Sequence, residues 1–212
     1  MHKRFDDPKR WTKYWDDPKR DQWQKPDEVI AALQLRGDET VADIGAGTGY
    51  FSVRLAKQLP QGNVIAVELA QPMVDWINDR AKKAGIDNVT AIQGAPDDPK
   101  LPTEVDVVLL VNVYHHIAGR AAYFTKVKQA LKPKGKLAIV DFRMGDMPFG
   151  PKDPHKISQH QVKRELESIG LSPCGSYDGL PYQYMRLFCA DTTTAGATPP
   201  PPAGGTEESP GS

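Results

Sequence analysis

The central part of the chain alternates between short aliphatic runs and longer segments in which apolar residues recur at helical spacing. The aliphatic runs are nearly continuous, as in strands of a parallel sheet that helices cover on both faces. They lie at residues 40–44, 63–69, 89–93, 105–113 and 135–142. Strands that alternate with helices predict an α/β fold with a doubly wound, mostly parallel sheet.

The helical segments lie before and between these runs. They are predicted at residues 26–35, 50–59, 72–85 and up to about Leu131. Beyond Phe142 a loop rich in Pro, Gly and Met (143–157) leads to another helix, which Gly170 ends. Two more strand-like segments, 172–178 and 183–190, bring the expected sheet to seven strands.

The two ends of the chain differ from this pattern. FDDPKRW at 5–11 is echoed by WDDPKRDQW at 15–23, and each DDP predicts a helix start with Asp7 or Asp17 as N-cap. We therefore expect an N-terminal helical segment (1–25), a main domain (26–190) and a tail (191–212). The tail is small, polar and proline-rich, so it is predicted to be disordered.

Composition narrows the possible functions. The 27 basic residues balance the 27 acidic ones, which gives no general attraction to nucleic acid or to an anionic membrane. The two cysteines, Cys174 and Cys189, indicate no disulfide framework, and we expect buried or idle thiols. No apolar run approaches the roughly 20 residues of a membrane span, and no signal-peptide core follows the basic N-terminus. The sequence predicts a cytoplasmic protein.

The most informative stretch is VADIGAGTGYF at 41–51, which follows a predicted strand and opens a helix. It lacks the lysine of a P-loop, which argues against nucleoside-triphosphate hydrolysis. A dinucleotide fingerprint, GxGxxG, places its third glycine one residue further on than this loop does. Asp43 followed by Gly45, Gly47 and Gly49 instead resembles motif I of the class I S-adenosylmethionine (SAM) methyltransferases. With Glu68 and the strand alternation, the chain looks most similar to the small-molecule branch around the ubiquinone and menaquinone methyltransferases.

The resemblance implies a Rossmann-like methyltransferase fold with SAM as the cofactor. Asp43 is expected to bind the ammonium group of SAM and Glu68 the ribose hydroxyls, while the helix N-terminus suits the carboxylate. Asp97 is favoured over Asp98 for the adenine, although a capping or turn role for both stays open. The implied cofactor-binding residues are Asp43, Gly45, Ala46, Gly47, Gly49, Glu68, Leu69, Asp97, Asn112 and Gln24. In this superfamily residues before the first strand often cover the cofactor, so 1–25 is also a predicted lid.

The candidate catalytic residues follow the fourth strand, in the run YHHI at 114–117. The resemblance places Tyr114, His115 and His116 beside the methyl group, with His115 the preferred base; a structural role for both histidines stays open. His155 is a further candidate, because loop 143–157 could close over the site with Met147 and Phe149. No metal is expected, since adjacent histidines point about 100° apart on a helix.

The sequence thus predicts a SAM-dependent methyltransferase with a small-molecule methyl acceptor. The absence of a [DN]PP[YF] motif after the fourth strand argues against nucleic-acid bases as acceptors, and no membrane partner is expected. Two alternatives stay open: a non-catalytic SAM-binding regulatory protein or subunit, and an NAD-type oxidoreductase. The acceptor atom and the oligomeric state do not follow from the sequence.

Overall fold

The computed structural model describes residues 7–148 and 150–190. The predicted tail (191–212) and the predicted lid residue Phe149 lie outside the described residues. The strands are β1 (Thr40–Ile44), β2 (Asn63–Glu68), β3 (Val89–Gln93), β4 (Val105–Val111), β5 (Leu131–Phe142), β6 (Leu171–Tyr177) and β7 (Gln183–Ala190). The α-helices are α1 (Pro8–Trp15), α2 (Lys19–Gln24), α3 (Pro26–Ala32), α4 (Ser52–Gln58), α5 (Gln71–Lys83), α6 (Arg120–Ala130) and α7 (Gln159–Glu167). Two 3₁₀ turns, η1 (Tyr114–His116) and η2 (Asp153–His155), complete the elements.

The seven strands form one sheet in the order β3-β2-β1-β4-β5-β7-β6. Strands β1 to β5 pair in parallel, whereas β7 runs antiparallel to both of its neighbours, β5 and β6. The predicted doubly wound, mostly parallel sheet is confirmed. Insertion of an antiparallel β7 between β5 and β6 departs from the 3-2-1-4-5-6 order of the dinucleotide-binding fold.

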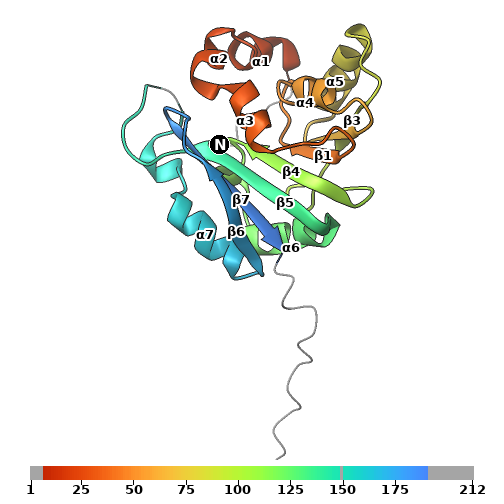
Figure 1. Ribbon diagram of the computed structural model, residues 1–212. Helices are drawn as coiled ribbons and strands as arrows, with labels where there is room; N and C mark the ends of the chain where they lie inside the picture. Colours follow the sequence, from red (N-terminus) through yellow and green to blue (C-terminus); the bar gives the residue numbers. More distant parts are fainter. Residues whose placement is uncertain (1–6, 149, 191–212) are drawn as a thin grey trace, which may run out of the picture.

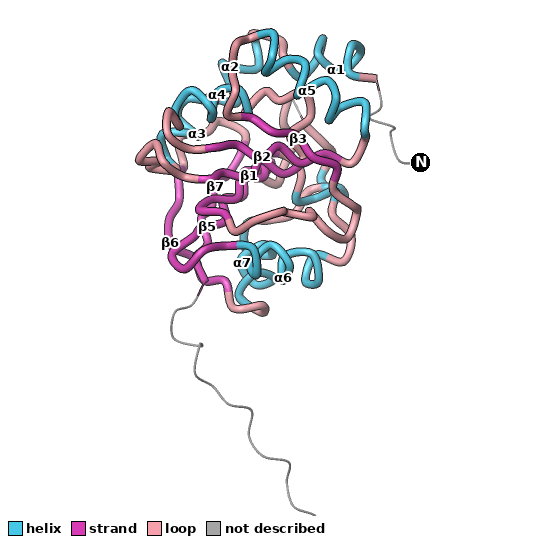
Figure 2. Tube along the Cα trace, turned by 90° about the vertical axis from the view of Figure 1, so that its right-hand side faces the viewer, coloured by secondary structure: helices cyan, strands magenta, loops and turns pink. Residues whose placement is uncertain are grey.

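Helices cover both faces of the sheet, as Figure 2 shows. On one face α3, α4 and α5 contribute Val29, Leu55 and Ile77, all fully buried, to one hydrophobic cluster. On the other face α6 and α7 contribute Phe124 and Val162 to a second cluster. Alternate residues of the central strands β1, β2, β4 and β5 enter the two clusters, which is why these strands read as aliphatic runs.

The two N-terminal helices lie beside the carboxyl end of β1 (Figure 1). The predicted cap of α1 is confirmed, because the Asp7 carboxylate accepts the Arg10 amide at 3.1 Å. At the second DDP, the Asp17 carboxylate accepts the amide of Lys19 at 2.9 Å, and α2 begins at Lys19, one residue later than predicted. These short helices depend on packing against the domain, since helices of this length are marginal alone.

Strand β4 ends two residues earlier than the hydrophobic pattern predicts. Its last residue is Val111, because Asn112 adopts a left-handed conformation with φ of +61°. Asparagine tolerates that conformation better than most residues. The chain therefore turns at Asn112 into η1, and α6 begins only after Gly119.

The expectation of two idle thiols is wrong. Cys174 and Cys189 form a disulfide, with Cα atoms 5.8 Å apart, between the antiparallel neighbours β6 and β7. Ser172 pairs with Cys189, and an irregularity between Pro173 and Gly175 changes the register next to it. Cysteines 15 residues apart in the sequence are thus brought within bonding distance by strand pairing, which spacing alone does not reveal.

None of the helices within the described residues has the length and apolar character that a membrane span requires.

Candidate active site

The glycine loop between β1 and α4 lies at the carboxyl end of the parallel strands. Gly45, Gly47 and Gly49 have φ angles of +72°, +61° and +78°, a region that favours glycine. A Cβ on Gly45 would lie 2.4 Å from a methyl group of Val113, so no side chain fits there. The Gly45 and Ala46 amides both donate to the carbonyl of Val67 in β2, at 2.8 and 3.1 Å. The loop is therefore anchored through its backbone and can approach a ligand closely.

Asp43, in β1, carries a buried carboxylate directly beneath this loop. Only 2% of the residue is exposed, and its Oδ2 accepts the hydroxyl of Ser52 at 2.6 Å. Burial raises the pKa of Asp43 to about 6, with the nearby charge of Glu68 acting in the same direction. A buried carboxylate with no cation bonded to it is suited to receive a positively charged group.

Glu68, at the end of β2, bonds back to the glycine loop. Its two carboxylate oxygens accept the amides of Gly47 at 2.7 Å and Leu69 at 2.9 Å. Burial raises the pKa of Glu68 above its usual value. The next residue, Leu69, is 54% exposed, while Glu68 itself is half-buried. The tip of β2 thus presents acceptor oxygens next to an open apolar side chain.

Helix α1 and the link to α2 pack directly on the glycine loop. An added Cβ at Gly47 would lie 3.0 Å from the Trp15 ring. The Asp16 carboxylate accepts the Thr48 hydroxyl and Arg80, both at 2.7 Å, and Arg80 also donates to the Thr48 carbonyl at 2.9 Å. The sequence predicted that residues 1–25 cover the cofactor and named Gln24, but it did not single out Trp15 or Asp16.

Three buried or half-buried amide side chains form a ring between α2, β4 and β7. Gln24 donates to Gln183 at 2.6 Å, Gln183 donates to Asn112, and Asn112 donates to Gln24 at 3.3 Å. Gln24 and Gln183 are fully buried. The structure therefore brings together two predicted site residues, Gln24 and Asn112, through Gln183. That residue was missed because it lies 159 positions from Gln24 and carries no motif.

His115 forms a buried pair with Asp141, the residue at the tip of β5. Its Nδ1 lies 2.8 and 2.9 Å from the two carboxylate oxygens, and its backbone amide donates to Asp141 at 3.3 Å. The side chains are 4% and 1% exposed. An ionised carboxylate only accepts hydrogen bonds, so Nδ1 carries a proton, and in the neutral ring Nε2 is the acceptor. Asp141 is not among the site residues predicted from the sequence.

Tyr114 and His116 flank His115 but face other surroundings. The Tyr114 hydroxyl donates to Glu165 at 2.6 Å, and its ring stacks on Phe124 within the second hydrophobic cluster. Arg120 pairs with the same carboxylate, which holds the pKa of Glu165 down at about 2. His116 is exposed, with its ring 4.1 Å from that of His115. Tyr114 is thus part of a packed polar network between η1 and α7.

The other predicted site residues lie apart from this group. The Asp97 side chain is 85% exposed, 4.0 Å from Lys126, while Asp98 pairs with Lys126 at 3.1 Å and accepts the amide of Lys100. His155 is exposed on η2. Within the described ranges, no group of three or more His, Cys, Asp or Glu residues is placed to hold a metal ion.

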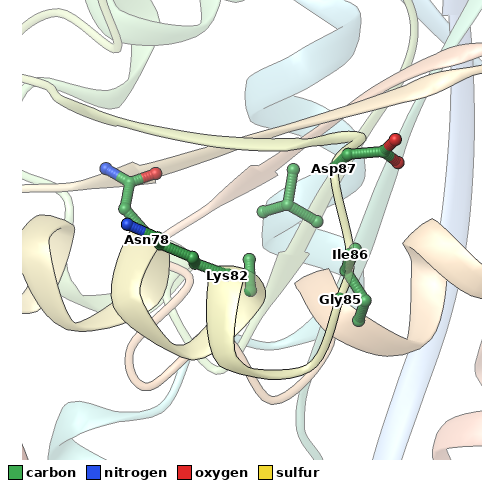
Figure 3. A pocket seen from close by; sticks show the side chains of 7 residues that line it. Asn78, Lys82, Gly85, Ile86 and Asp87 are labelled. Carbon is green, nitrogen blue, oxygen red and sulfur yellow. The ribbon is translucent and has the colours of Figure 1, made fainter.

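A surface pocket lies elsewhere, between the end of α5 and the start of β3. It is lined by Asn78, Ala81, Lys82, Gly85, Ile86, Asp87 and Val89, as Figure 3 shows. None of these residues belongs to the glycine loop or to the histidine pair, so the pocket is separate from the candidate site.

The strand order, the backbone-anchored glycine loop and the acid at the tip of β2 define the class I methyltransferase fold. A family model described as "Methyltransferase domain" matches residues 35–188. The chain therefore belongs to the methyltransferase domain family, and the resemblance predicted from the sequence is confirmed. The comparisons give the NAD-type and non-catalytic alternatives no support.

Relatives and solved structures agree with this assignment. The 27-O-demethylrifamycin SV methyltransferase of Amycolatopsis mediterranei is 30% identical over 188 residues, which cover 80% of this chain and 68% of the relative. The demethylmenaquinone methyltransferase of Listeria welshimeri is 24% identical over 128 residues, 59% of this chain and 53% of the relative. A SAM dependent methyltransferase from Aquifex aeolicus has a TM-score of 0.79 at 25% identity, covering 86% of this chain and 97% of that one. The chain thus spans two thirds of one curated relative and about half of the other.

Proposed function

We propose that the protein is a SAM-dependent methyltransferase that methylates an oxygen of a small-molecule acceptor, with His115 as general base. The observation that carries the oxygen assignment is the buried His115–Asp141 pair at the tips of β4 and β5. A base is needed only when the nucleophile loses a proton during transfer, as a hydroxyl does. The relative named 27-O-demethylrifamycin SV methyltransferase acts, by its name, on a compound that lacks a methyl group on an oxygen, which is the same class of acceptor.

The residues of the glycine loop fit the cofactor. The buried Asp43 carboxylate suits the ammonium group of the methionine end, and Glu68 retains free lone pairs for the ribose hydroxyls. Leu69, 54% exposed, offers an apolar surface for the adenine. Gly45, Gly47 and Gly49 let the backbone approach the cofactor closely, and the Ala46 amide helps to anchor the loop on Val67. When bound, SAM supplies an electrophilic methyl group on a positively charged sulfur.

The chain's own contribution to the reaction is placement and proton removal. Asp141 holds His115 in the tautomer whose Nε2 accepts a proton, and it stabilises the imidazolium that forms. The amide ring of Gln24, Asn112 and Gln183 fixes the adjacent strand tips. Placement of two reactants can supply roughly 7–11 kcal/mol of the barrier, and a general base typically adds about 10²–10⁴-fold.

Four predicted site residues have no part in this proposal. Tyr114 is bonded to Glu165, and the side chains of His116, His155 and Asp97 are exposed. The predicted cytoplasmic location stays a prediction. The Cys174–Cys189 disulfide argues against it, because such bonds are rare in the reducing cytosol.

The proposal is tested with SAM that carries a trideuterated methyl group and a panel of small phenols and alcohols. Mass spectrometry should detect acceptors in which one hydroxyl proton is replaced by the labelled methyl. His115→Gln should lower the turnover number by about 10²–10⁴-fold while affinity for S-adenosylhomocysteine (SAH) stays within about twofold. The control, His160→Gln, changes an exposed histidine on α7 and should leave both quantities unchanged. An unaltered rate in His115→Gln would remove the base from the proposal.

A further inference from the structure

Arg20, on α2, lies over the aromatic pair that follows the glycine loop. Its guanidinium carbon is 4.0 Å from the centre of the Tyr50 ring and 5.9 Å from that of Phe51. One terminal nitrogen donates to the Trp15 carbonyl at 2.8 Å and the other to Gln24 at 3.3 Å. These contacts fix the orientation of the guanidinium, so it is held in place before any ligand binds.

Arg20 lies near the carboxylates of Asp16 and Asp43, but neither of them is bonded to its guanidinium. Its Nε is buried without a hydrogen-bond partner, and no carboxylate of the described residues forms an ion pair with it. Arg54 provides the comparison, because it stacks on the same Tyr50 ring at 4.0 Å but is paired with Asp21 at 3.1 Å. A buried guanidinium with an unused donor is unfavourable unless an anion completes its bonding.

Arg20 also lies close to the buried carboxylate of the loop. Asp43 and Arg20 are near enough for each charge to stabilise the other's ionised form, although burial outweighs this effect at both groups. No bond among the described residues joins the two side chains, so two opposite charges lie near each other without forming a pair. An α-amino acid group carries an ammonium and a carboxylate on a single carbon and matches that pairing of charges.

We propose that Arg20 binds the α-carboxylate of the cofactor's methionine end, so that Arg20 and Asp43 together recognise a zwitterion. This inference rests on the proposed function, since it assumes SAM as the cofactor. It replaces the sequence-based expectation that a helix N-terminus receives the carboxylate. Helix α4 has only seven residues, begins without a side-chain cap, and offers at most a partial charge where Arg20 offers a full one.

The test compares ligands with and without the carboxylate. Calorimetry on the full chain would measure SAH, its decarboxylated analogue and 5′-methylthioadenosine, which lacks the entire amino acid group. Arg20→Met should weaken SAH binding by about 10- to 100-fold, the range of a charge-assisted hydrogen bond, and change binding of the two other ligands by less than about threefold. Arg20→Lys should recover part of the loss for SAH. Arg54→Met is the matched control, because it removes a guanidinium from the same ring without touching the proposed site.

Each alternative gives a separate result. Equal losses for SAH and for 5′-methylthioadenosine in Arg20→Met would mean that Arg20 only holds α2 in place, and the proposal would be wrong. Unchanged SAH affinity in Arg20→Met would also overturn it. Failure of the wild-type chain to bind any of the three ligands would instead overturn the proposed function. Each variant is judged by comparing its affinities for the three ligands. A general loss of stability would lower all three affinities together and would not imitate a selective loss for SAH.

Discussion

The candidate site has two halves that are built in different ways. The cofactor half comprises Asp43, the glycine loop (45–49) and Glu68, which come from two consecutive strands. Its bonds run largely through the backbone, as when Glu68 accepts the Gly47 amide at 2.7 Å. The acceptor half comprises Gln24, Asn112, His115, Asp141 and Gln183, which come from four separate segments: α2, the turn from β4 into η1, β5 and β7. Its bonds join side chains, such as His115 to Asp141 at 2.8 Å.

This difference explains how each half can fail. A backbone cradle depends on left-handed φ angles, so a single Cβ in it introduces both strain and a clash. A side-chain network depends on having the correct donor and acceptor at each position, so an isosteric change in one group disturbs the chemistry while leaving the shape. We therefore expect variants of the first half to lose cofactor binding and variants of the second to lose turnover.

The largest effect is expected from Gly47→Arg in the cofactor half. Gly47 has φ of +61°, and its Cβ would lie 3.0 Å from the Trp15 ring. SAH affinity should fall by at least roughly 100-fold, because only glycine lets a ligand approach the backbone this closely. Calorimetry would measure the affinity and thermal unfolding the stability.

Gly85→Arg serves as its control. Gly85 has φ of +66° but no atom within 4 Å of an added Cβ, so it shares the backbone strain without the clash. It should bind SAH as the wild type does. If Gly47→Arg also binds SAH normally, the cofactor does not lie along this loop.

In the acceptor half, Asp141→Asn should lower the turnover number by about 100-fold, because an amide can bond His115 in the wrong tautomer. SAH affinity should stay within about twofold. The measurement is a pH–rate profile for wild type and variant, with Asp75→Asn as a control on the exposed surface of α5. An equal fall in rate and in SAH affinity would show that the two halves are not separable.

A smaller effect is expected at Asp43. Its pKa is raised from 3.8 to about 6, and the ammonium group needs the ionised form. SAH affinity should therefore fall up to tenfold per pH unit below pH 6 and level off above it. Asp43→Asn should bind SAH about tenfold more weakly at pH 8 and lose this pH dependence. A wild-type affinity that is constant from pH 5 to 8 would contradict the role of Asp43.

In the ligand-free chain, the stability of the fold depends on pH in the opposite direction to SAH affinity. Because the folded pKa of Asp43 is raised, its contribution to the free energy of unfolding is complete below pH 4 and is lost as the pH rises through about 6. Asp43→Asn should remove this fall in the free energy of unfolding. Urea unfolding of the ligand-free wild type and variant between pH 4 and 8 would measure the difference.

The two halves also differ in what the sequence reveals. Strands β1, β3 and β7 lie where the hydrophobic pattern predicts them, and the glycine loop was found because its residues are contiguous. The Asp141 pair, Gln183 and the Cys174–Cys189 disulfide were missed. Each depends on which strands are neighbours and in which register, and this information is absent from local spacing. Strand β4 is shorter than predicted because Asn112 has a left-handed φ. The pattern of aliphatic residues carries no information about that backbone conformation.

The most direct test of the central claim is calorimetric titration of the wild-type chain with SAH and, separately, with NAD⁺ at pH 8. The proposed methyltransferase should bind one SAH per chain and show no heat of binding with NAD⁺. Binding of NAD⁺, or no binding of SAH at millimolar concentration, would contradict it.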